Sequence, residues 1–183
     1  MTAVAPQRLA VPADARAISS LMRASAAGIF PRFYDSRQVA SALLYIARLD
    51  VQLIEDGTYF VHEAGGEIVA CGGWSRRARL HAGAGEAADD GRLLDPLAEP
   101  ARVRAMFVRS DWTRRGLGRA ILSSCEQAAR AEGFSKLALM ATLPGERLYR
   151  AFGFRELARP MLTLPDGVRV QGVAMEREIA AVR

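Results

Sequence analysis

The stretch that decides the fold of this chain is residues 106–120, which reads MFVRSDWTRRGLGRA. It begins with three apolar residues, continues through a short polar loop and reaches two glycines, Gly116 and Gly118. Beyond them, apolar residues recur at the spacing of an amphipathic helix from Ile121 to Ala129. The stretch therefore predicts a strand, a loop and the start of a helix, in that order.

This predicted loop suits an anionic ligand. The N-terminus of a helix offers unbonded N–H groups and the positive end of the helix dipole, and both attract phosphate. Gly116 and Gly118 carry no Cβ, so a pyrophosphate can approach the backbone closely. Arg114, Arg115 and Arg119 add guanidinium groups, which suit phosphate oxygens. The loop is a candidate phosphate-binding site; the alternative is a tight loop that only leads into the helix.

Two familiar phosphate-binding motifs do not match this loop. The Walker motif requires a lysine after its last glycine, and the one lysine of the chain is Lys136. The dinucleotide-binding motif requires a third glycine where Ile121 stands. The predicted strands around the loop also do not form a run of βαβ units. The motif by itself therefore does not identify the ligand.

The rest of the chain predicts strands and helices on either side of this stretch. A β-hairpin is expected at 58–74, where two β-rich runs flank the glycine pair Gly65-Gly66. Together the predicted elements indicate one α+β domain over residues 1–183, with a mixed, mainly antiparallel central sheet and helices on both faces. The further elements are a strand at 7–11, helices at 14–28 and 36–46, a strand at 102–108, a helix ending at Gly133, a strand at 137–140, a helix at 144–152, and strands at 156–164 and 168–179.

Residues 76–100 differ from the rest of the chain in composition. They hold three glycines and two prolines among alanine, acidic residues and arginine. We expect a long exposed insertion here, which either borders the acceptor site of an enzyme or is a variable surface excursion.

The charge of the chain is basic but dispersed. The net charge is +5, and 24 of the 25 basic residues are arginines that occur from Arg8 to Arg183. A nucleic-acid-binding surface needs a basic stripe with interleaved aromatic residues, and the sequence has no such stripe. We therefore expect no nucleic-acid partner, and expect part of the charge to attract an anionic cofactor.

Membrane, secretory and metal-binding classes are not expected either. No apolar run is long enough to span a bilayer, and residues 1–12 lack the pattern of a secretory signal, so we expect a cytoplasmic protein. Cys71 and Cys125 fall in apolar patterns and are expected to be small buried hydrophobes. His62 and His81 lack neighbouring ligands, so no metal site is expected.

Three motifs together resemble the GNAT acetyltransferase superfamily. Residues 115–120, RGLGRA, match the Arg/Gln-x-x-Gly-x-Gly/Ala loop of that family, and 106–108 stand where the family has the preceding strand. Residues 148–154, LYRAFGF, resemble its recurrent Leu-Tyr-x-x-x-Gly-Phe ending. The likeness extends to 8–14 and to the hairpin at 59–74, so it covers nearly the whole chain.

The resemblance implies the fold stated above, acetyl-coenzyme A as co-substrate and transfer of the acetyl group to an amine by direct attack. It implies that the main chain of Met106, Phe107 and Val108 bonds the pantetheine arm, with one amide near Phe107 polarising the thioester carbonyl. Tyr149 would be the general acid that protonates the departing thiolate, or else a residue that only packs. The pyrophosphate would be held by the loop residues Arg114, Arg115, Gly116, Leu117, Gly118, Arg119 and Ala120.

Two positions depart from relatives and leave the general base open. No carboxylate lies in 137–140, where certain members carry a glutamate, and Thr142 stands about where others have an asparagine. Glu99, His62 and His81 are candidate proton acceptors through water.

The acceptor and the state of assembly also stay open at this point. The acceptor is a small-molecule or protein amine, the acyl group is acetyl or longer, and the protein is a monomer or a homodimer. The alternative to an enzyme is a catalytically inactive domain that senses acyl-coenzyme A.

Overall fold

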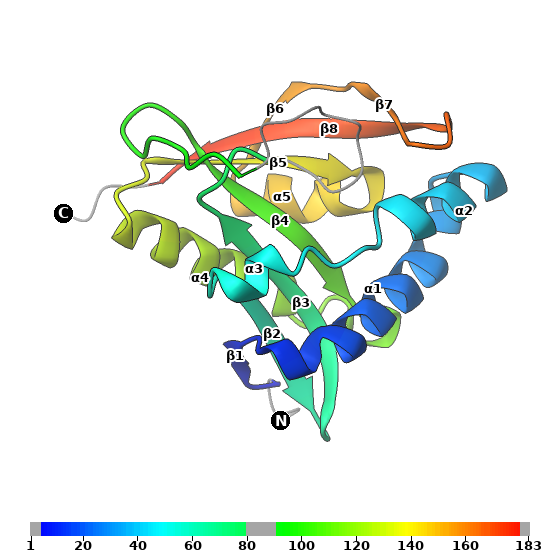
Figure 1. Cartoon of the computed structure of the whole chain (residues 1–183). Helices are drawn as coiled ribbons and strands as arrows, with labels where there is room; N and C mark the ends of the chain where they lie inside the picture. The colour runs from blue at the N-terminus through cyan, green and yellow to red at the C-terminus, as the bar shows by residue number, and fades with distance from the viewer. Residues whose placement is uncertain (1–4, 80–90, 180–183) are drawn as a thin grey trace.

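The computed structural model describes residues 5–79 and 91–179. Eight strands form one sheet in the order β1-β2-β3-β4-β5-β8-β6, with β7 also paired to β8 (Figure 1). Neighbouring strands are antiparallel except β4 and β5, which are parallel, so the predicted mixed and mainly antiparallel sheet is confirmed. The strands are β1 (Gln7–Leu9), β2 (Tyr59–Ala64), β3 (Glu67–Ser75), β4 (Ala101–Val108), β5 (Lys136–Thr142), β6 (Arg155–Ala158), β7 (Met161–Thr163) and β8 (Arg169–Glu178).

Helices cover both faces of this sheet. Buried residues of α1, α2 and α3 share one core cluster, and those of α4 and α5 share the other (Figure 1). Asp35 caps α2, because its carboxylate accepts the N–H of Gln38 at 2.8 Å. The helices are α1 (Ala15–Ile29), α2 (Ser36–Tyr45), α3 (Gln52–Glu55), α4 (Leu117–Ala131) and α5 (Glu146–Phe152), with short 3-10 turns at Pro12–Asp14, Phe30–Arg32, Ser110–Trp112 and Leu143–Gly145.

The two cores follow the alternation of side chains along the central strands. Tyr59 and Val61 on β2 face α1, whereas Phe60 between them packs toward α4. Both cysteines are fully buried, Cys71 in the core beside α1 and Cys125 in the core beside α4. Burial raises the pKa of the Cys71 thiol to about 12, so this thiol stays protonated and packs as a hydrophobe.

The strands β4 and β5 pair only at their N-terminal ends. Ala101 lies opposite Leu137 and Arg102 opposite Ala138, and no further pairs follow between the two strands. Three residues after Arg102, Ala105 has a left-handed φ of +52°. This region of β4 is a β-bulge, which bends the strand away from its neighbour.

The bulge is held by contacts from β2 and β3. The Tyr59 hydroxyl donates to the carbonyl of Ala105 at 2.6 Å. Gly72 lies between the two registers of the β3–β4 ladder, and a Cβ there would come within 2.2 Å of the Met106 sulfur. The lack of a side chain at Gly72 therefore leaves room for Met106 on the bulged strand.

The structure corrects the sequence predictions at two places. The strand expected at 156–164 is two strands, β6 and β7, separated at Arg159 and Pro160. Pro160 has no N–H to donate to a ladder, so the strand is interrupted there. The helix α3 was not predicted, because four residues carry too little periodicity to distinguish a helix from a turn.

The described parts of the 76–100 segment are not wholly exposed. The Ala78 N–H donates to the Arg92 carbonyl at 2.9 Å, and the Leu94 N–H donates to the Arg76 carbonyl at 2.8 Å. Leu94 is only 5% exposed and packs in the core beside α4, which corrects the expectation of a simple surface excursion. Residues 80–90, which include His81, lie outside the described residues.

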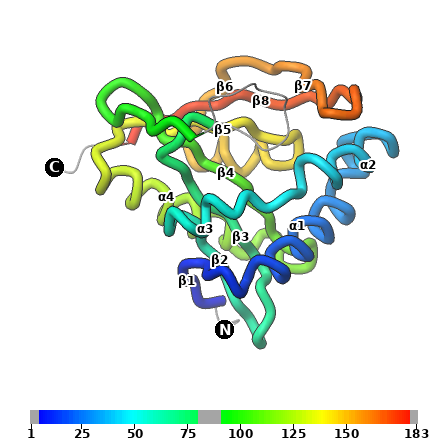
Figure 2. Tube along the Cα trace, viewed as in Figure 1, coloured from blue at the N-terminus to red at the C-terminus, as the bar shows by residue number. Residues whose placement is uncertain are grey.

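None of the helices within residues 5–79 and 91–179 combines the length and apolar composition needed to cross a membrane. Figure 2 shows how the chain leaves α2 and runs back across one face of the sheet to α3 before it enters β2. This crossing segment reaches β4, where Asp50 pairs with Arg104 at 3.2 Å. It therefore contributes to the site that β4 helps to form.

Candidate active site

A cavity of about 760 Å³ lies where β4 and β5 separate. Its lining comes from the N-terminus of α4, from α5, from the facing parts of β4 and β5, from α1 and from the β7–β8 region. Segments far apart in the chain thus meet around one hollow. The missing pairing of two central strands, and not a surface depression, creates the space.

The loop before α4 forms one end of this cavity. Gly116 is the N-cap residue of α4 and has a φ of +83°, a left-handed conformation that glycine adopts without strain. The Ala120 N–H donates to the Gly116 carbonyl at 2.9 Å, and this is the first hydrogen bond within the helix. The N–H groups of Leu117, Gly118 and Arg119 precede it and have no acceptor within the helix. These three residues line the cavity, so the amides lie where an anion would be held.

Helix packing, and not only the approach of a ligand, explains why residue 118 is a glycine. A Cβ there would come within 2.8 Å of the Leu148 side chain on α5. Gly118 is buried in the contact between α4 and α5. Close packing of two helices, in addition to close approach of a ligand, therefore requires glycine at this position. At Gly116, in contrast, a Cβ would meet nothing within 4 Å, and only the backbone conformation favours glycine.

The three arginines of the loop are not equivalent. Arg114 and Arg119 line the cavity, and Arg114 has a left-handed φ of +62°. Arg115 stacks on the ring of Trp112 at 4.4 Å and donates to the Asp111 carbonyl at 3.2 Å. Neither Arg115 nor Ala120 lines the cavity, so the structure does not bring these two predicted residues to it.

The strand residues Met106, Phe107 and Val108 all line the cavity, but their amides differ in direction. The Arg109 N–H donates to a carbonyl of β3 at 2.9 Å. Since backbone groups alternate along a strand, the N–H and C=O of Val108 point away from β3 and toward the opening. The Val108 carbonyl accepts the Ser25 hydroxyl of α1 at 2.7 Å, which leaves the Val108 N–H as the cleft-facing donor.

Tyr149 stands on α5 at the boundary between the cavity and the core. It is 8% exposed, lines the cavity and makes an edge-to-face contact with Phe154 at 5.8 Å. Burial raises the pKa of its phenol well above the ordinary range. A Cβ at Gly145 would come within 2.9 Å of the Tyr149 ring, so this glycine leaves the space that the ring occupies.

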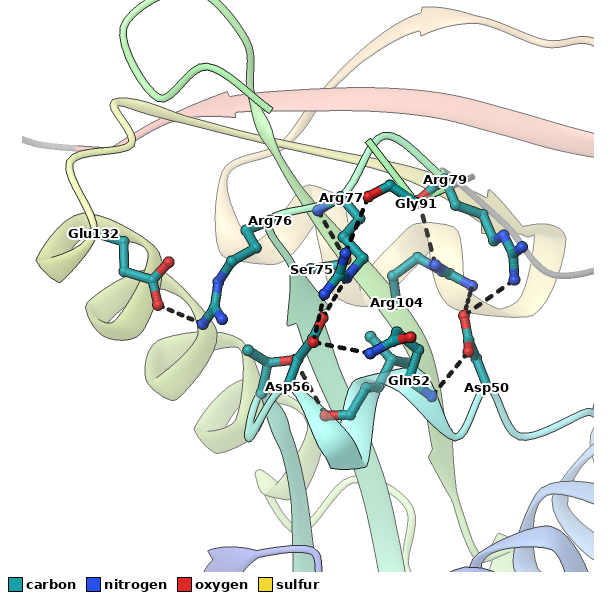
Figure 3. A network of polar contacts seen from close by, with 12 residues as sticks. Asp50, Gln52, Asp56, Ser75, Arg76, Arg77, Arg79, Gly91, Arg104 and Glu132 are labelled. Atoms are coloured by element: carbon teal, nitrogen blue, oxygen red, sulfur yellow. Dashed lines mark hydrogen bonds and ion pairs between the residues drawn. The ribbon is translucent and has the colours of Figure 1, made fainter. Parts of the chain in front are cut away.

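The opposite end of the cavity carries two arginines that the sequence analysis did not single out. Arg104 on β4 is 4% exposed, and Arg48 follows α2. Arg104 donates to Asp50 at 3.2 Å and to the Arg79 carbonyl at 3.3 Å, as Figure 3 shows. A charged residue between Val103 and Ala105, inside an apolar strand, is the signal that could have indicated it.

The candidate proton acceptors of the sequence analysis do not lie in the cavity as far as the structure describes them. His62 is buried in β2 with its Nδ1 2.7 Å from the Ala5 carbonyl, and it is not a lining residue. Glu99 pairs with Arg92, which lowers the pKa of its carboxyl to about 2 and makes it a poor base. His81 lies outside the described residues. Thr142, in contrast, lines the cavity.

Comparison with known proteins places the chain in a family. Residues 55–156 match the model of the acetyltransferase (GNAT) domain. The comparison with curated protein sequences gave no match.

Solved structures give the same fold. A GCN5-related N-acetyltransferase from Rhodopseudomonas palustris is 16% identical, with a TM-score of 0.73 over 97% of this chain and 98% of its own. PaiA N-acetyltransferase from Thermoplasma acidophilum, solved in complex with coenzyme A, is 10% identical, with a TM-score of 0.63 over 94% and 98%. The ribosomal-protein-S18-alanine N-acetyltransferase from Escherichia coli is 17% identical, with a TM-score of 0.58 over 97% and 96%. Because the family model covers more than half of the chain, including the loop before α4, the bulged strand and Tyr149, this protein belongs to the GNAT acetyltransferase family.

Proposed function

We propose that this protein is an acetyl-coenzyme A-dependent N-acetyltransferase that passes an acetyl group to a primary amine by direct attack. One observation carries the proposal: a single cavity joins the free amides of α4, the opened edge of β4 and the Tyr149 ring. An anion-binding end, a strand edge with unpaired amides and a proton donor are the parts that such a transfer needs. The coenzyme A in the T. acidophilum structure supports the choice of co-substrate.

The residues that line the cavity fit the parts of acetyl-coenzyme A. The N–H groups of Leu117, Gly118 and Arg119, with the Arg114 and Arg119 guanidiniums, would hold the pyrophosphate. The free edge of β4 from Met106 to Val108 would bond the pantetheine arm as a neighbouring strand would. When bound, the co-substrate supplies an acetyl group on a thioester. The Val108 N–H would stabilise negative charge on the thioester oxygen.

Tyr149 would act as the general acid. Its raised pKa keeps the phenol protonated at neutral pH, so the Oη proton is available when the sulfur leaves. The cysteines are not needed as nucleophiles, since both thiols are buried outside the cavity lining. With direct attack, the surplus proton of the amine must leave by another route. None of the described lining residues is Asp, Glu or His, so we assign this step to water.

An acceptor panel with a free-thiol assay tests the proposed function. The purified protein is incubated with acetyl-coenzyme A and representatives of small amines, amino acids and peptides with free N-termini. Release of thiol that depends on the amine, together with the mass of the acetylated product, is the expected result. Longer acyl donors in the same assay define the acyl preference.

Binding measurements separate an enzyme from a sensor. Coenzyme A should raise the melting temperature, because a ligand that binds only the folded state stabilises it by mass action. A rise with no turnover on any amine would contradict the enzyme and support an acyl-coenzyme A sensor. The absence of a rise would contradict both.

A further inference from the structure

The positive charge at the end of the cavity opposite α4 has no role in the proposed transfer. Arg104 stands on β4 just before the bulge, and Arg114 to Arg119 lie beyond the C-terminal end of the same strand. From residue 104 to residue 108 the strand extends roughly 13 Å at about 3.3 Å per residue. The cavity therefore has two basic ends, and the pyrophosphate can occupy only one of them.

Arg104 makes fewer hydrogen bonds than a guanidinium can donate. It is 4% exposed, and its two hydrogen bonds to described groups are those to Asp50 and to the Arg79 carbonyl. A guanidinium has five N–H donors, so these two hydrogen bonds use only part of its capacity. Asp50 also pairs with Arg79 at 3.5 Å, so one carboxylate is shared between two cations (Figure 3). Of these residues only Arg104 lines the cavity, and none of the described lining residues is acidic.

Arg48 adds a second positive charge. It lies two residues before Asp50, which pairs with Arg104, and both arginines line the cavity. Arg48 is exposed and makes no ion pair with another described residue. Its charge is therefore available to a molecule that enters the cavity.

Apolar residues on both sides of α2 and in the β7–β8 region also line the cavity. Hydrogen bonds tie the segment around α2 to the β7–β8 region. Tyr34 donates to the Gln171 carbonyl at 2.9 Å, Gln38 to the Arg169 carbonyl at 2.8 Å and Ser41 to Asp166 at 2.8 Å. The apolar residues are Ile29, Phe30, Ile46, Leu162, Leu164 and Val170.

We propose that the acceptor is a small primary amine with an apolar body and an anionic group, and that Arg48 and Arg104 hold the anionic group. This inference rests on the proposed function and names the substrate class for it. A guanidinium binds a carboxylate or a phosphate through paired hydrogen bonds, and the apolar walls take the body of the molecule. Polyamines are disfavoured, because a second cation would enter a positive field. The same field favours the neutral form of the amine, which is the form that attacks.

Matched ligands test this inference by calorimetry on the whole chain, with and without bound coenzyme A. The set is leucine, its amide, isopentylamine and the phosphonate analogue of leucine. Leucine should bind at least about tenfold more tightly than its amide, the scale of a hydrogen bond to a charged group. Tighter binding of the phosphonate than of leucine would assign the anionic group to the phosphate class within the same proposal. Equal binding of all four molecules would overturn it.

Variants test the residues. Arg48→Ala should remove most of the preference for leucine over its amide, and Arg48→Lys should restore part of it. Arg23→Ala removes an equal charge from the exposed side of α1, away from the cavity, and should leave the preference unchanged. An undiminished preference in Arg48→Ala would overturn the assignment. Because Arg48 is exposed, this test does not depend on replacing the buried Arg104.

The free-thiol assay with the same ligands distinguishes failure of this inference from failure of the proposed function. Turnover of isopentylamine and leucinamide equal to that of leucine would contradict the proposal of an anionic acceptor. The same result would still support the proposed acetyltransferase activity. Selective binding of leucine without turnover on any amine would support the basic end as a ligand site and contradict the transfer.

Discussion

At the scale of single residues, contacts made in the folded protein, and not the neighbouring residues in the sequence, set the properties of the site residues. Tyr149 occupies a place where burial keeps a phenol protonated, beside the cavity that α4 and β4 share. Gly118 serves helix packing against Leu148, whereas Gly116 serves a left-handed turn. Two glycines of one motif thus have different physical roles, and their substitutions should have different effects.

The role of Tyr149 predicts a specific loss of turnover. Tyr149→Phe keeps the ring and its contact with Phe154 but removes the Oη proton. We expect kcat to fall by roughly 10²-fold, at the low end of general acid–base effects, because thiolate is a fair leaving group. Coenzyme A affinity and melting temperature should change little. Steady-state kinetics on a proven acceptor measure the effect, with Tyr45→Phe on α2, outside the cavity lining, as the control. Full activity in Tyr149→Phe would assign Tyr149 to packing.

The left-handed turn at Gly116 predicts a loss of coenzyme A binding. Gly116→Ala should destabilise the fold by about 1–2 kcal/mol, the cost of a left-handed alanine. Relief of that strain would displace the free amides of α4, so the rise in melting temperature caused by coenzyme A should shrink. Gly66→Ala is the matched control, since Gly66 has a similar φ of +80° and equally open surroundings. Equal responses of the two variants to coenzyme A would exclude the α4 amides from the binding site.

At the scale of elements, a carboxylate anchors the 76–100 segment to α3. Asp56 accepts two hydrogen bonds from Arg77, at 2.7 and 2.9 Å, and a third from Gln52 at 3.0 Å (Figure 3). Arg77 lowers the pKa of the Asp56 carboxyl below its usual value. The neighbouring pair of Arg76 with Glu132, the C-cap residue of α4, is more exposed. The first pair should therefore contribute more to stability than the second.

This difference predicts a pH-dependent effect of Asp56→Asn. A carboxyl with a lowered folded pKa stabilises the fold above its unfolded pKa of about 4, and that contribution is lost as pH falls toward the folded value. Asp56→Asn should therefore cost about 1–3 kcal/mol at pH 7, and the difference from the parent should shrink below about pH 4. Urea unfolding across this pH range measures it. Glu132→Gln should cost less, and a pH-independent cost in Asp56→Asn would contradict the ionic origin.

At the scale of the whole molecule, the cavity exists because two central strands, β4 and β5, pair only at their N-terminal ends. Ser25 on α1 and Gly172 on β8 both line it, although they are 147 positions apart in the sequence. The basic residues that line the cavity come from several elements and together create a positive electrostatic potential. Ligand binding should therefore respond to salt.

The arginines at the α4 end predict a salt-dependent affinity for coenzyme A. Affinity should fall several-fold between roughly 50 and 500 mM salt, because exposed charges are screened. Pantetheine lacks the pyrophosphate, and its binding should show little dependence on salt. Arg114→Gln should reduce the dependence for coenzyme A, and the exposed Arg16 gives a control substitution away from the cavity. Equal salt dependence for both ligands would contradict an ionic pyrophosphate site.

The sequence by itself determined the local features of this protein. The strand before the loop, the glycine at the left-handed turn and the helix α4 follow from apolar spacing and backbone preference over about 25 residues. The mixed sheet and the hairpin of β2 and β3 followed in the same way. The break at Pro160 had a local signal, the missing N–H of proline, but the apolar pattern ran through it.

Only the tertiary structure decided which residues meet in the cavity. The bulge at Ala105 depends on the Tyr59 hydroxyl, the space at Gly118 on Leu148, and the basic end on the contact of Asp50 with Arg104. Each pairs residues at least 30 positions apart, and neither hydrophobic periodicity nor a short motif encodes such a contact. The chain specifies the strands and helices locally, but the opening between β4 and β5 arises from the packing of all of them.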